Sequence, residues 1–237
     1  MGFSKKAIFV LLGVLLLGSG LVMAIRGATV SGATDLTRWT AGTAGSDTTE
    51  GGNITSLNLD SNTLTDRWAG YFGNVTGYIY LTDASGATTN YLFRWNTTNE
   101  TIAGEVCAST NDTYNFATAT GLTSAGNIDS AWGFSGGADL ATATYNSGTC
   151  GSFTFDEQGV TISNAVKAQH HTPSTFYSCA INNTAVAYKG DLAFCTPIQT
   201  ISAGKNYLNQ PANFELIVPA NDTNGATETY YFYAEIN

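Results

Sequence analysis

A serine motif and two histidines are the residues whose types first suggest catalysis. Residues 133–137 read Gly-Phe-Ser-Gly-Gly and match the G-x-S-x-G pattern of a serine nucleophile, with Ser135 at its centre and His170 or His171 as a possible base. This pattern marks a nucleophile only where a strand turns into a helix of an α/β sheet. The chain lacks the alternating strand and helix patterns of such a sheet, so we predict a Gly/Ser-rich loop and no catalytic residue.

The remaining candidates for metal or acid chemistry also favour ordinary loops. His170 and His171 are adjacent, and adjacent residues of a strand point to opposite faces, so they could not both bind one metal from a strand. Thr172 and Pro173 follow them, so we expect an exposed loop there. Residues 220–225 have the polar composition of a calcium loop but lack its first carboxylate and its late glutamate. Asp156 and Glu157 fall in a predicted turn. We therefore predict no metal ion and no cofactor.

The N-terminus has the three parts of a secretory signal. Lys5 and Lys6 precede an apolar run over 7–21, and residues 22–24 offer small residues for cleavage after Ala24. We predict that residues 1–24 are a signal peptide that is removed. The alternative is a retained apolar helix, either a membrane anchor or the core helix of a type IV pilin processed before Ile8.

The charge of the exported chain excludes some partners. Without Lys5 and Lys6, 7 of the 9 basic residues remain against 18 acidic ones, which gives a net charge of −11. Phosphate contacts dominate nucleic-acid affinity and require the opposite sign. We expect no nucleic-acid partner, and membrane contact only through an uncleaved N-terminal segment.

Four cysteines indicate two disulfides, because an even number in an exported chain is typical of an oxidising compartment. Pairing within local loops predicts Cys107–Cys150 and Cys179–Cys195. A zinc site is disfavoured because no pair has CxxC spacing.

Seven asparagines fit the N-glycosylation pattern, each with threonine two residues later. Given export, we expect most of them to be exposed and some to be modified. They are Asn53, Asn74, Asn96, Asn99, Asn111, Asn182 and Asn221.

Short alternating segments separated by turns predict an all-β fold. We expect three hairpins, formed by 75–82 with 90–95, by 152–155 with 159–163, and by 214–218 with 229–236. Such spacing is typical of a β-sandwich of Greek-key or jelly-roll type. We divide the chain into the signal, an extended segment over 25–52 and a sandwich domain over 53–237, in which about 107–200 form a loop-rich, disulfide-linked insertion.

Several segments resemble secreted archaeal β-rich cell-surface glycoproteins. The resemblance rests on the run DRWAGYFGNVTG at 66–77, the aromatic strand at 90–95, and the segments 105–110, 214–219 and 230–235. It implies a protein of the cell envelope and transfers no catalytic residue. The predicted architecture is also similar to that of archaeal bundling-pilus subunits and TasA-like matrix proteins, although no motif of theirs is present.

These features favour a non-enzymatic extracellular protein that forms a filament from copies of itself. Residues 25–40 are small, compatible with a strand and without a strong reason to pack on their own domain, so we expect them to add to the sheet of a neighbouring subunit. Val30, Leu36 and Trp39 would anchor this interface. The alternatives are a carbohydrate-binding or adhesion module that contacts surface glycans through exposed aromatic residues, and a type IV pilin-like subunit.

Overall fold

The computed structural model describes the central and C-terminal parts of the chain and short pieces before them. Residues 26, 78–82 and 91–96 are described by backbone alone. The predicted signal and its alternative helix lie outside the described residues. The described residues are 26–33, 46, 48, 50–52, 54, 56, 65–76, 78–82, 91–96, 104–156, 158–171, 174–183, 188–200, 203–220 and 227–236.

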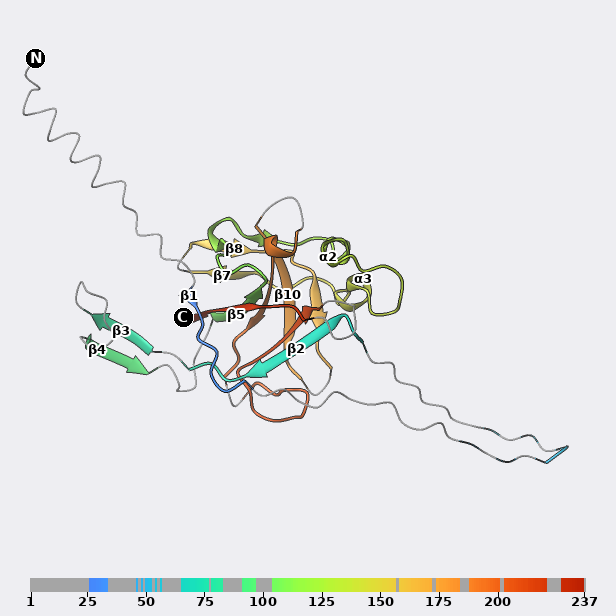
Figure 1. Ribbon diagram of the computed structural model, residues 1–237. Coiled ribbons are helices and arrows are strands. Elements are labelled where there is room, and N and C mark those ends of the chain that lie inside the picture. Colours follow the sequence, from blue (N-terminus) through green and yellow to red (C-terminus); the bar gives the residue numbers. More distant parts are fainter. Residues whose placement is uncertain are drawn as a thin grey trace, which may run out of the picture.

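Seven antiparallel strands form the central sheet, so the predicted β-rich fold with few helices is confirmed (Figure 1). The order is β1-β13-β5-β11-β10-β6, and β9 also pairs with β10. The strands are β1 (Arg26–Gly27), β13 (Tyr231–Ile236), β5 (Gly104–Ser109), β11 (Leu192–Pro197), β10 (Tyr177–Asn182), β6 (Thr120–Gly121) and β9 (Lys167–Gln169).

One face of this sheet is covered by a two-stranded sheet and two short helices. β2 (Trp68–Gly73) pairs with β12 (Phe214–Pro219), and α2 (Gly126–Trp132) and α3 (Ala141–Thr144) contribute to the same core. Alternate residues of the central strands point to this side, as strand geometry requires. The buried side chains that meet there include Ala108, Ala180, Phe194, Leu216 and Val218.

The opposite face is covered by a small hairpin and a 3-10 turn. β7 (Phe153–Phe155) pairs with β8 (Val160–Ile162), and η1 (Phe116–Thr118) packs against them. A second turn, η2 (Lys189–Asp191), precedes β11. The buried residues of this second core include Cys107, Cys179, Cys195, Phe116, Phe155 and Ile162.

Two of the three predicted hairpins form. β3 (Tyr78–Thr82) pairs with β4 (Tyr91–Asn96), and β7 pairs with β8. The third prediction is wrong, because β12 pairs with β2 while β13 pairs with β5 in the central sheet. β12 and β13 therefore lie in different layers.

The stretch predicted as an insertion supplies most of the central sheet. β5, β6, β9, β10 and β11 all come from residues 104–197. The three longest of these strands are buried on both faces, which hides the alternation that marked the other strands. β5 is buried at all six positions, β11 at its first five and β10 at its middle four.

The predicted disulfide pairing is wrong, although both disulfides are present. The bonds join Cys107 to Cys195 and Cys150 to Cys179. β11 lies between β5 and β10, and the register places Cys195 opposite both Cys107 and Cys179. Three cysteines thus meet across neighbouring strands, and pairing follows contacts in the sheet rather than closeness in sequence. Two disulfides suggest an oxidising environment.

Candidate functional site

The outer edge of β13 is where the N-terminal segment meets the described body. Arg26 lies opposite Ala234 and Gly27 opposite Tyr233, and the N–H of Ala28 donates to Phe232 O at 2.7 Å. The expectation that residues 25–40 do not pack on their own domain is therefore wrong for residues 26–28. Among the described residues, β1 has two residues while β13 has six, so the pairing they show covers only part of the edge.

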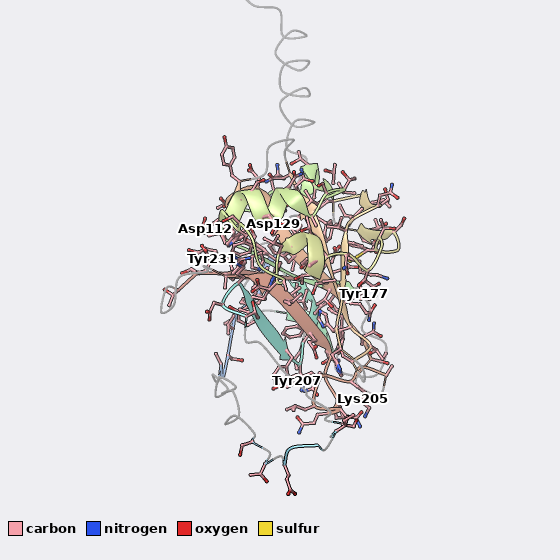
Figure 2. All side chains as sticks on the ribbon, turned by 90° about the vertical axis from the view of Figure 1, so that its right-hand side faces the viewer. Asp112, Asp129, Tyr177, Lys205, Tyr207 and Tyr231 are labelled. Carbon is pink, nitrogen blue, oxygen red and sulfur yellow. A yellow bond between two sulfur atoms is a disulfide. The ribbon has the colours of Figure 1, made fainter. Side chains whose placement is uncertain are left out.

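An open groove of about 200 Å³ lies along this edge. Figure 2 shows Asp112 and Tyr231 on the same side of the molecule, and both line the groove. Val30 also lines it and is 61% exposed, so one of the three predicted interface residues lies at an accessible sheet edge. Leu36 and Trp39 lie outside the described residues. The lining residues are Gly27, Ala28, Val30, Asp112, Tyr230, Tyr231, Phe232 and Tyr233.

Two tyrosines of this edge, Tyr230 and Tyr233, donate hydrogen bonds through their hydroxyls. The hydroxyl of Tyr233 donates to Asn111 O at 2.6 Å, and burial raises its pKa. The hydroxyl of Tyr230 donates to Pro219 O at 2.6 Å, and its pKa is raised by burial and by the charge of Glu228. These two hydroxyls already have partners within the chain, so an extended chain at this edge would bind through backbone hydrogen bonds and apolar contact.

Two buried carboxyl groups lie where β13 ends. Glu235 is opposite Glu105 in the register of β13 and β5, and the residues are only 4% and 9% exposed. One carboxylate oxygen of Glu105 is buried without a hydrogen-bond partner. Burial, followed by the charges of Glu235 and Asp156, raises the pKa of Glu105 to about 7. Near neutral pH a proton on Glu105 relieves the repulsion between the two groups.

The loop with the G-x-S-x-G pattern is a structural connection. Gly133 caps the end of α2 with a φ of 72°, a conformation that favours glycine. The Arg67 guanidinium then binds the carbonyls of Ser135 and Gly136 and lies 3.2 Å from Asp139. Ser135 is exposed, and its carbonyl rather than its hydroxyl makes these contacts. The motif therefore holds β2 to the segment after α2.

His170 belongs to a buried polar chain that the sequence did not predict. Its Nε2 lies 2.9 Å from Ser178 Oγ, and its Nδ1 lies 3.0 Å from Glu215 Oε1, with a side chain only 7% exposed. The exposed loop predicted for the two histidines holds for His171 alone.

The order carboxylate, imidazole, hydroxyl is that of a catalytic triad, but three features oppose catalysis. Ser178 is fully buried, and its Oγ already accepts the N–H of Ile217 at 3.0 Å. The contact between His170 Nδ1 and Glu215 is not aligned as a hydrogen bond. A substrate carbonyl would need open space beside this hydroxyl. The chain instead ties β10 to β12 across the two layers.

The predicted glycosylation sites differ in their surroundings. Asn74 is exposed. Asn111 is half-buried, and its amide donates to Gly190 O at 3.2 Å while its oxygen accepts from Thr113. Asn182 is also half-buried and accepts from Thr120. The side chain of Asn96, and all of Asn53, Asn99 and Asn221, lie outside the described residues.

Two of the three aromatic residues of β2 contribute to the core. Trp68 donates its indole N–H to Asp139 O at 2.6 Å and packs against Phe134 and Tyr145. Tyr71 meets Phe232 of β13 edge to face. Both side chains are half-buried. Tyr71 joins β2 to the central sheet, and Trp68 joins β2 to the segments that follow α2 and α3.

Within the described ranges, no group of three or more metal-ligating side chains was found, and no helix is long and apolar enough to cross a membrane. A scan against protein-family models found no match. Searches of curated proteins and of solved structures found none either.

Proposed function

We propose that this chain is a non-enzymatic structural subunit of an extracellular filament, built from copies of itself on a cell surface of the archaeal type. The layered core is then a β-sandwich of Greek-key or jelly-roll type, whose edges carry the contacts between subunits. The observation that carries the proposal is the pairing of residues 26–28 with the edge of β13, beside a groove that stays open.

The position of this strand favours exchange between copies. Cleavage after Ala24 would leave Arg26 one residue from the new N-terminus, so the strand would be a free end. Residues 27–33 are exposed, so they gain little burial on their own domain. The same backbone pairs can form with β13 of a neighbour, where Val30 and the residues after it would add apolar contact. Such a contact runs from head to tail and propagates as a fibre unless it closes into a ring.

Deletion of residues 25–40 behind an intact signal tests the proposal. The secreted product should be folded, disulfide-bonded and monomeric by size-exclusion chromatography with light scattering, while the full chain forms filaments in electron micrographs. Filaments from the truncated protein would refute assembly through this segment. The mature N-terminus separates the rival forms, because Ile25 indicates signal cleavage and Ile8 indicates pilin processing.

A point variant sharpens this test. Ala28→Pro removes the N–H that donates to Phe232 O, and Ala28→Ser retains it. Assembly should weaken in the proline variant only. Equal assembly of both variants would show that this backbone pairing does not join subunits.

A further inference from the structure

The second sheet has one edge without a described partner. β2 pairs with β12 along all six of its residues, and no described strand pairs with its other side. Natural proteins protect such edges with charged residues, proline or bulges. The sequence of β2, WAGYFG, contains none of these, and its register with β12 is regular.

The hydrogen bonds of Ile217 establish which backbone groups of β2 point outward. The N–H of Ile217 donates to Ser178 Oγ and its carbonyl accepts from the Tyr145 hydroxyl, so both groups point away from β2. Ile217 lies opposite Gly70, and in an antiparallel ladder the two members of such a pair both direct N–H and C=O outward. Gly70, and by alternation Trp68 and Phe72, therefore present backbone donors and acceptors at the outer edge.

This edge is accessible. Gly70 is exposed, and Phe72 is exposed beside Tyr207, whose ring it meets edge to face at 5.6 Å. Figure 2 shows Tyr207 at the end of the molecule opposite α2. An incoming strand would lie next to β2 in the second layer, over the part of the central sheet where Tyr71 contacts Phe232.

The next hairpin in the chain, like the outer edge of β2, has no third strand beside it among the described strands. β3 and β4 pair only with each other among the described strands, and Figure 1 shows them beside the body. The register places Ile79 opposite Trp95 and Leu81 opposite Phe93. A two-stranded hairpin is at best marginally stable in water and gains stability from a third strand.

The link between β2 and β3 within one chain starts in a direction away from the open edge. It consists of residues 74–77, a length that can connect two antiparallel neighbours. However, the N–H of Val75 donates to Asn213 Oδ1, and Val75 packs in a small core with Val106 and Ile198. Asn213 precedes β12, so the link is held on the β12 side of β2.

We propose that the β3–β4 hairpin of one copy adds to the outer edge of β2 in a second copy. The second layer then has four strands, β12-β2-β3-β4, with the hairpin supplied by the neighbour. The two copies would thus exchange a hairpin that could otherwise pair with β2 of its own chain. Such domain swapping is a low-cost route to association. The inference rests on the proposed homopolymer, and it assigns a second contact independent of the N-terminal strand.

Gly70→Pro is the direct test, with Gly70→Ala as its matched control. Proline removes an N–H that β12 does not use, and proline is tolerated on edge strands. A Cβ at this position would meet only Leu216 O, at 3.9 Å, so alanine fits the fold and the Cβ of proline meets no clash. In the full mature protein, proline should raise the concentration for half-assembly about tenfold or more, which corresponds to about 1.4 kcal/mol. Alanine should leave it unchanged.

Hydrogen exchange of the wild-type protein provides a second measurement that needs no variant. The amides of Gly70 and Phe72 should exchange rapidly in the dilute monomer and slowly in the assembled form. Rapid exchange in the assembled form would overturn the inference, and so would protection in the monomer, which would mean that the hairpin binds its own β2. If the wild type assembles and the proline variant assembles equally well, this contact is wrong while the filament proposal stands. A wild type that remains monomeric at every concentration overturns both.

Discussion

Neutralising Glu105 should stabilise the protein at neutral and alkaline pH. Glu105 is 9% exposed and lies opposite Glu235 on the neighbouring strand. Burial and the charge of Glu235 raise its pKa from 4.5 to about 7. Between these two values the folded state binds a proton that the unfolded state has released. The free energy of unfolding therefore falls as the pH rises from about 4.5 to 7, and it levels off above that range.

The size of this effect follows from the shift. A difference of about 2.5 in pKa at about 1.4 kcal/mol per pKa unit gives roughly 3 to 4 kcal/mol. Glu105→Gln retains the shape of the side chain but cannot lose a proton. At pH 8 the variant should therefore be more stable than the wild type by an amount of this order, less the cost of any hydrogen bond that the amide fails to make.

Denaturant unfolding at half-unit intervals from pH 4 to pH 9 provides the measurement. The difference between wild type and Glu105→Gln should change only between pH 4.5 and 7. Asp156→Asn is the control, because it also removes one negative charge, but from an exposed turn. The charge of Asp156 is the smallest of the three causes that raise the pKa of Glu105. A pH-independent difference between wild type and Glu105→Gln would refute the reasoning.

Four further predictions concern stability and reactivity. Thiol labelling of the unfolded, unreduced protein should find no free cysteine, and peptide mapping should recover the pairing seen in the structure; two or more reactive thiols would contradict the oxidised fold. Trp68→Ala should cost about 3 kcal/mol in thermal or denaturant unfolding, because it removes a half-buried ring and the hydrogen bond to Asp139 O, whereas an unchanged melting temperature with lost sugar binding would favour an adhesion module. Ser178→Ala should cost about 1–3 kcal/mol, because it leaves the Ile217 N–H and the His170 ring without their partner. Folded wild type should not react with a fluorophosphonate at Ser178, and labelling there would show that the buried chain is accessible for catalysis.

Local signals in the sequence predicted local structure. The β3–β4 and β7–β8 hairpins follow from alternating residues around a polar turn, which is information held within about twenty residues. The pairings of β12 with β2 and of β13 with β5 join strands that are distant in the chain. Local patterns cannot select between such partners, so two adjacent strand patterns were predicted to pair with each other.

The errors in the candidate sites have related physical causes. The alternation of β5 is hidden because both of its faces are buried, so its cysteine was assigned to a loop. α2 was missed because its seven residues include a glycine and a serine and are too short for a clear helical period. His170 was predicted to be exposed because its partners, Ser178 and Glu215, lie eight and 45 residues away and meet it only when β10 and β12 stack.

The Cys107–Cys195 bond has a mechanical consequence. The cysteines are 88 residues apart, and an extended chain of that length would span roughly 300 Å. When the chain is pulled from its two ends, tension passes through the sulfur bridge and bypasses every residue between the two cysteines. The strands inside this loop therefore cannot unravel under load, and only the N-terminal segment, the first strands and the last two can lengthen. A subunit joined to its neighbours through those outer parts would stretch by a limited length and then resist as a covalent link.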